Sequence, residues 1–101
     1  MPTSFSGMVK IVDDAARADI AKIRNAQENL NDSLASIQKL RANASAMQGQ
    51  TGSAIVEQSQ KMEARINEMN SKLTATIATI EKIVNWYHEE DRRLASKIHS
   101  I

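Results

Sequence analysis

The chain has 101 residues, 42% hydrophobic and 25% charged, which fits one globular domain over residues 1–101 rather than a disordered chain. Its net charge of +1 gives no electrostatic reason to expect binding to nucleic acid or to an anionic membrane. The chain contains no cysteine, which excludes disulfide bonds and thiolate metal sites.

Two further classes are disfavoured by the distribution of apolar residues. No segment approaches the roughly 20 apolar residues that a transmembrane helix needs, so membrane insertion is not expected. Residues 1–14 lack the basic head and apolar run of a cleavable signal peptide. We therefore expect a cytoplasmic protein, or one exported without a cleavable signal.

The amino-acid composition is typical of a helical protein. Pro occurs once and Gly three times, and there are only three aromatic residues. Ala, Leu, Ile, Met, Gln, Glu and Lys are abundant, and these residues favour helices over strands. The predicted fold class is all-α.

Residues 1–13 are ambiguous, because Val9, Ile11 and Val12 are β-branched and Gly7 interrupts the segment. We interpret them as a short lead-in. Asp13 is a plausible N-cap residue, since carboxylates favour the positive end of a helix dipole. The first helix is therefore predicted over residues 14–47.

The first predicted helix carries a wide apolar stripe, which indicates an amphipathic helix with more than a minimal coiled-coil seam. One column repeats every seven residues, and a second set fills the adjacent positions. The column consists of Ala16, Ile23, Leu30, Ile37 and Ala44, and the adjacent set of Ile20, Ala26, Leu34, Leu40 and Met47.

A turn is predicted where the helical pattern stops, at residues 49–53, preceded by Met47. Gly49 can adopt the left-handed conformation that ends a helix, and Gly52 lies in the same segment. Thr51 or Ser53 can cap the next helix. The turn residues are thus Met47, Gly49 and Gly52.

A second helix is predicted over residues 53–97. Its main column keeps a strict seven-residue spacing, whereas its companion column drifts, as expected for a long straight helix. The main column is Ile66, Leu73, Ile80, Tyr87, Leu94 and Ile101; the companion column is Met62, Met69, Ile77, Val84 and Ile98.

Two helices joined at this turn predict an antiparallel hairpin in which residue n lies opposite roughly residue 100 minus n. Residues from about Tyr87 onward then project beyond the first helix, unless the lead-in folds back to cover them. A hairpin leaves part of each apolar stripe exposed, so we expect a four-helix bundle with another chain, either a homodimer or a heteromer. The predicted partner-binding face is Ile20, Ile23, Leu30, Leu34, Ile37, Leu40, Ile80, Ile83 and Trp86.

No catalytic, metal or cofactor site is predicted. His88 and His99 are three helical turns apart, too far to chelate one metal ion on a straight helix. Glu89 and Arg93 form an i, i+4 pair, which is typical of a solvated face. There is no nucleophile elbow, phosphate loop or Gly-rich cofactor motif, so enzymatic activity is not expected.

Asp91 breaks the companion column of the second helix, where an apolar residue is expected. Burying an unpaired carboxylate is costly. Asp91 is therefore either at an exposed helix end, where any residue is tolerated, or bound to a specific partner.

The length, the central Gly turn and the segment Tyr87-His88-Glu89-Glu90-Asp91 together resemble the WXG family of small type VII secretion proteins. In that family a Trp-x-Gly tripeptide occupies the turn, and a Tyr-x-x-x-Asp/Glu motif in the C-terminal helix is part of the export signal. Here Met47-Gln48-Gly49 keeps the Gly but lacks the Trp. The departure indicates a divergent branch, similar to the small partners of LXG toxins in Gram-positive bacteria.

The resemblance implies a targeting or chaperone protein that binds the helical N-terminal domain of a larger effector. Tyr87 and Asp91 would serve as the export signal read by the secretion ATPase. Such a protein resides in the bacterial cytoplasm before export and is then secreted. Two alternatives remain open: a homo-oligomeric coiled-coil scaffold or intracellular chaperone unrelated to secretion, and a needle-like filament subunit of another secretion system.

Overall fold

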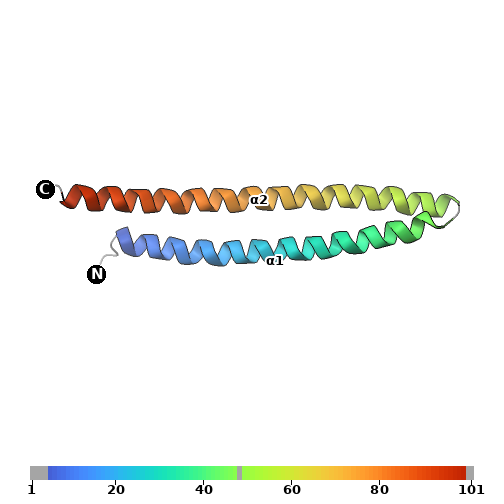
Figure 1. The fold of residues 1–101 in the computed structure, drawn as a ribbon, viewed down its shortest axis with the longest axis horizontal. Helices are drawn as coiled ribbons and strands as arrows, with labels where there is room; N and C mark the ends of the chain where they lie inside the picture. Colours follow the sequence, from blue (N-terminus) through green and yellow to red (C-terminus); the bar gives the residue numbers. More distant parts are fainter. Residues whose placement is uncertain (1–4, 48, 100–101) are drawn as a thin grey trace. The chain divides into compact units, whose positions relative to one another are not determined.

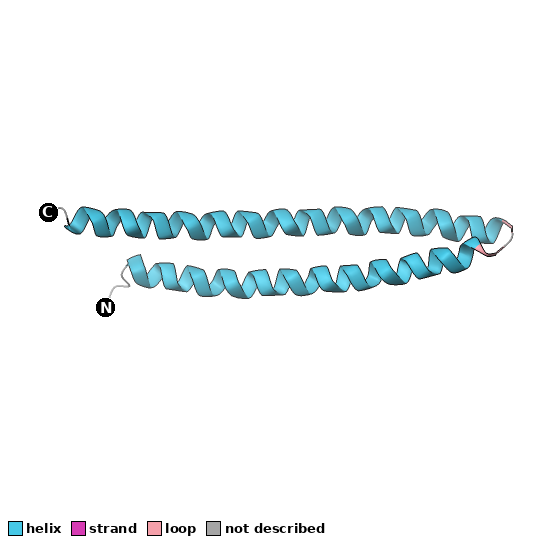
Figure 2. Cartoon of the chain, in the orientation of Figure 1, coloured by secondary structure: helices cyan, strands magenta, loops and turns pink. Residues whose placement is uncertain are grey.

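The computed structural model describes residues 5–47 and 49–99. Helix α1 spans Phe5–Ser45 and helix α2 spans Gln50–His99, with 41 and 50 residues (Figure 1). The rest of the described chain is the turn between them, and no described residue is in a strand (Figure 2). The predicted all-α helical hairpin is confirmed.

Contacts divide the chain into two compact units, each with a segment of both helices. Residues 24–74 form the unit that contains the turn, and residues 1–23 and 75–101 form the other. In the first, Gln27 contacts Thr74 and Gln38 contacts Glu63, so the two segments run antiparallel. In the second unit, residue 6 contacts residue 91 and residue 13 contacts residue 88, so its two segments also run antiparallel.

The core of the unit 24–74 is a narrow seam between α1 and α2. Ile37, Ala44 and Ile66 are buried there, and Leu30 and Leu73 are half-buried. These residues belong to the two predicted columns with seven-residue spacing. The main columns are therefore confirmed in this unit.

The other unit has a seam of the same kind. Val9 and Ala16 are buried in it. Half-buried residues complete it, namely Ile20, Ile23, Ile77, Ile80, Val84, Tyr87 and Leu94. Ile98, predicted in the companion column, is 70% exposed. Ile101 lies outside the described residues.

The predicted drift of the companion column in α2 is wrong. Met62 and Met69 are 48% and 46% exposed, whereas Glu63 and Asn70 are half-buried in the seam. Glu63, Asn70, Ile77, Val84 and Asp91 keep a strict seven-residue spacing. Each polar member of this column has a hydrogen-bond partner on α1: Arg41 for Glu63, Asn31 for the Asn70 amide nitrogen and Ser6 for Asp91.

The predicted start of the first helix is also wrong, because α1 begins at Phe5 rather than at residue 14. Val9 is only 5% exposed, and Phe5 stacks on Tyr87. These contacts with α2 outweigh the lower helix propensity of the β-branched residues in this segment. Asp13 is therefore inside a helix and does not cap one.

The turn brings two glycines into positions that require glycine. Gly49 has φ of 97°, in the region that side chains rarely adopt, and it accepts the first helical hydrogen bond of α2, from the Ser53 amide at 3.3 Å. Gly49 thus occupies the N-cap position, and the predicted caps Thr51 and Ser53 lie within α2. A Cβ atom on Gly52 would lie 2.8 Å from the Met47 carbonyl oxygen and 2.9 Å from that of Ala44.

Candidate functional site

Tyr87 and Asp91 lie one turn apart on α2 and pack against the first residues of α1. The Tyr87 ring stacks on Phe5, with ring centroids 6.0 Å apart and an interplanar angle of 22°. The Ser6 hydroxyl donates a hydrogen bond to Asp91 Oδ1 at 2.8 Å. Both Tyr87 and Asp91 are half-buried, so the start of α1 fixes this pair of side chains without covering it.

The expected projection beyond the first helix is not found at Tyr87 and Asp91, because the start of α1 lies against both residues, which is the exception allowed for a lead-in that folds back. The predicted register is close, because the residue numbers of Asp13 and His88, which contact each other, add to 101. The error lies in the helix start, since α1 begins nine residues earlier than predicted and reaches alongside Tyr87 and Asp91. Of the two explanations considered for Asp91, a specific partner is the one found.

Neighbouring side chains surround this pair. Trp86 is 54% exposed and meets the Tyr87 ring edge-on, with centroids 5.0 Å apart. His88 Nε2 lies 2.8 Å and 3.0 Å from the two carboxylate oxygens of Asp13. Tyr87 is therefore held between two aromatic rings, and His88 joins α2 to α1 beside it.

The next turn of α2 carries an exposed ion pair. Arg93 Nη2 and Nε donate to Glu90 Oε2 at 2.7 Å and 3.1 Å. The hydrogen bond and the charge of Glu90 raise the pKa of the Arg93 guanidinium, so Arg93 stays cationic. The predicted pairing of Arg93 with Glu89 is wrong, because Arg93 pairs with Glu90, three residues before it on the helix.

The described residues contain no group of three or more His, Cys, Asp or Glu side chains placed to hold a metal ion. His88 is bound to Asp13, and α2 reaches its end at His99.

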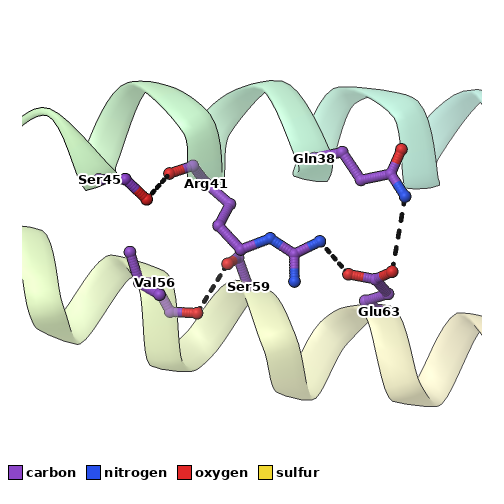
Figure 3. A network of polar contacts seen from close by, with 6 residues as sticks. All are labelled: Gln38, Arg41, Ser45, Val56, Ser59 and Glu63. Atoms are coloured by element: carbon purple, nitrogen blue, oxygen red, sulfur yellow. Dashed lines mark hydrogen bonds and ion pairs between the residues drawn. The ribbon is translucent and has the colours of Figure 1, made fainter.

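A polar contact that sequence reasoning missed crosses the seam of the unit 24–74. Figure 3 shows Arg41 of α1 reaching Glu63 of α2, with which it forms an ion pair. Gln38 Nε2 also donates to Glu63 Oε1 at 3.5 Å. Only about a quarter of the Arg41 and Glu63 side chains is exposed, at 26% and 24%. The pair therefore links the two helices near the turn.

A second polar contact lies further from the turn in the same unit. Gln27 Nε2 donates to Thr74 Oγ1 at 3.0 Å and to the Asn70 carbonyl oxygen at 3.4 Å. Asn70 Nδ2 donates to Asn31 Oδ1 at 3.1 Å, while Asn70 Oδ1 is buried without a hydrogen-bond partner. Gln27 and Arg41 share a column with Leu34 at seven-residue spacing, which is the signal that could have placed them in the seam.

The residues predicted as a partner-binding face differ in how far they are exposed. Ile37 is buried in the seam between α1 and α2 of this chain, and Leu40, Ile83 and Trp86 are about half exposed, at 48%, 49% and 54%. The remaining members are half-buried along the two seams: Ile20, Ile23, Leu30, Leu34 and Ile80. Only three of the nine residues are therefore exposed in the single chain.

The two lateral faces of the unit 24–74 differ in chemistry. One, which we call the Met62 face, is mainly apolar, and its members recur at seven-residue spacing on both helices: Ala26, Ser33 and Leu40 on α1, and Ile55, Met62 and Met69 on α2. The opposite one, the Gln60 face, carries only polar residues at the equivalent positions: Asn31, Gln38 and Ser45 on α1, and Ser53, Gln60 and Asn67 on α2. In each unit the buried residues lie in the seam between α1 and α2. In the unit 24–74 the Met62 face stays mainly apolar.

The protein is an all-α helical hairpin in which polar side chains of the two helices contact each other within the seams. No family model, curated protein or solved structure matches the chain. Neither α1 nor α2 contains a stretch long and apolar enough to cross a membrane.

Proposed function

We propose that this protein is a non-enzymatic targeting partner of a type VII secretion system. It binds the helical N-terminal domain of a larger effector in the bacterial cytoplasm, in a four-helix arrangement. It then contributes Tyr87 and Asp91 as part of the signal that the secretion ATPase reads, and it is exported with the effector.

The observation that carries this proposal is the placement of Tyr87 and Asp91. They lie one helical turn apart, and Phe5 and Ser6 hold them at a fixed position on α2. The hydrogen bond between Ser6 and Asp91 is exposed, so a receptor group can reach the carboxylate. A receptor can recognise an ordered aromatic ring beside an accessible carboxylate with little loss of side-chain entropy, because both side chains are already held in place before binding.

The test is co-export of the effector with an Asp91→Ala variant in the native host. We expect export to fall to background while circular dichroism of the purified variant shows unchanged helix content. Glu89→Ala is the matched control, since it removes an exposed carboxylate two residues away, at a position that the Tyr-x-x-x-Asp motif leaves unspecified. Undiminished export of the Asp91→Ala variant would contradict the proposal.

A further variant separates recognition of Asp91 from its structural contact. Ser6→Ala removes the hydrogen bond to Asp91 but leaves the carboxylate in place. If the carboxylate is the signal, Ser6→Ala should retain most of its export, with at most a modest decrease because Asp91 is less firmly held. Equal loss in both variants would mean that Asp91 acts by holding the start of α1.

A further inference from the structure

The Met62 face is an unpartnered, mainly apolar surface within residues 24–74. Leu40 on α1 and Met62 on α2 line one groove, and a second groove lies between Ala26 on α1 and Met69 on α2. Leu40, Met62 and Met69 are 48%, 48% and 46% exposed. Ser33, the one polar member of the face, is small and exposed, so it leaves room for a close approach. Apolar residues at this spacing on two antiparallel helices form a surface that fits a third helix lying lengthwise.

The charge around this face is one-sided. The positions that border it on α2 include Arg65 and Lys72, and those on α1 are neutral: Asn29, Ser36 and Asn43. Arg65 forms no ion pair with any described residue, whereas Lys72 Nζ lies 3.3 Å from Glu68 Oε1 in an exposed pair. An ammonium group has three hydrogen-bond donors, so Lys72 can contact a ligand carboxylate while it remains paired with Glu68.

The same charges argue against a second copy as the occupant. The members of the Met62 face and the bordering positions named above are neutral or basic, and the carboxylate next to them, Glu68, is paired with Lys72 of its own chain, so a second copy offers little to neutralise Arg65. A partner that places carboxylates along the border would be favoured by complementary charge.

From these observations we propose that the Met62 face binds an amphipathic helix of another protein whose apolar stripe is bordered by Asp or Glu. The inference deepens the proposed function, because it names the face and the charge of the helical partner. It can fail separately, since Asp91 lies outside residues 24–74.

The probe is a pair of synthetic helical peptides of equal length with the same leucine stripe, bordered by Glu in one and by Lys in the other. Binding to the full chain is measured by fluorescence anisotropy at low ionic strength. We expect the Glu-bordered peptide to bind about three- to tenfold more tightly, the range that two exposed ion pairs provide. Equal affinity for the two peptides, or no binding of either, would overturn the inference.

Charge reversal provides the sharper comparison. In the double variant Arg65→Glu and Lys72→Glu, the preference should switch to the Lys-bordered peptide. The matched control is the double variant Arg24→Glu and Lys39→Glu, which changes the net charge equally at exposed positions away from this face. The control should keep the original preference, and a switch there would mean that only net charge matters.

A third comparison tests the face itself. Met62→Glu should weaken binding of both peptides at least tenfold, whereas Gln60→Glu on the opposite face should not. Both side chains are exposed, so helix content should be unchanged in circular dichroism. If sedimentation instead shows a dimer that Met62→Glu converts to a monomer, the occupant is a second copy and the inference is wrong.

Discussion

Gly52 shows how a single residue sets the approach of the two helices at the turn. It is buried in the first turn of α2, where an added Cβ atom would lie under 3.0 Å from two carbonyl oxygens, one in the last turn of α1 and one in the turn that follows it. Those oxygens belong to the backbone of Ala44 and Met47, which cannot rotate away as a side chain can. Gly52 is therefore needed for close packing, whereas Gly49 is needed for its positive φ.

Replacing Gly52 with Ala should therefore destabilise the hairpin. We expect the free energy of unfolding to fall by about 1–2 kcal/mol, because overpacking outweighs the roughly 1 kcal/mol that Ala gains in helix propensity. Urea unfolding followed by circular dichroism measures the change. Ser53→Ala, at the next and exposed position, is the control. An unchanged or higher midpoint for Gly52→Ala would show that the turn relaxes at little cost.

Asp91 and Glu63 illustrate what sequence reasoning misses at this scale. Both fall in a column where apolar residues are expected, and each contacts the other helix, Asp91 through Ser6 and Glu63 mainly through Arg41. The partners lie 85 and 22 residues away in the chain, so no local pattern connects them. These two contacts could have been found by aligning the two helices in antiparallel register first and counting polar residues as possible members of the seven-residue columns.

At the scale of the elements, the two helices, the turn and the main columns were predictable from periodicity and glycine placement. The start of α1 was not, because local propensity in residues 5–13 is weak and contacts with α2 decide the conformation. Val9 and Ala16 continue the column of Ile23 and Leu30 at seven-residue spacing, a signal that favoured an earlier start. The β-branched residues and Gly7 obscured it.

Amide hydrogen exchange tests the start of α1 directly. The amides of residues 9–13 have helical partners if α1 begins at Phe5, whereas in a helix starting at residue 14 they would have none. We expect them to exchange slowly, at rates within about tenfold of residues 16–20 in the same unit. The amides of residues 50–52, at the start of α2, give an internal reference for unprotected helix ends. Exchange of residues 9–13 at the rate of an unfolded chain would contradict an α1 that begins at Phe5.

At the scale of the whole molecule, little apolar surface is deeply buried. Among the described residues the buried hydrophobic side chains are Val9, Ala16, Ile37, Ala44 and Ile66, two of which are alanine. Trp86, Ile83 and the Met62 face stay exposed at the same time. A small core together with exposed apolar residues implies marginal stability for the isolated chain, and stabilisation by a bound partner.

The melting temperature should therefore depend on a partner and not on the protein's own concentration. If the exposed apolar surface binds a different protein, as proposed, raising the chain concentration a hundredfold should leave the melting temperature unchanged. Adding the Glu-bordered helical peptide at about one hundred times its Kd should stabilise the chain by about 2.7 kcal/mol, a rise of roughly 10–20 °C. Differential scanning fluorimetry at several chain concentrations measures both effects, with the Lys-bordered peptide as control. A melting temperature that rises with chain concentration alone would instead assign the exposed apolar surface to self-association, as in a homo-oligomeric scaffold.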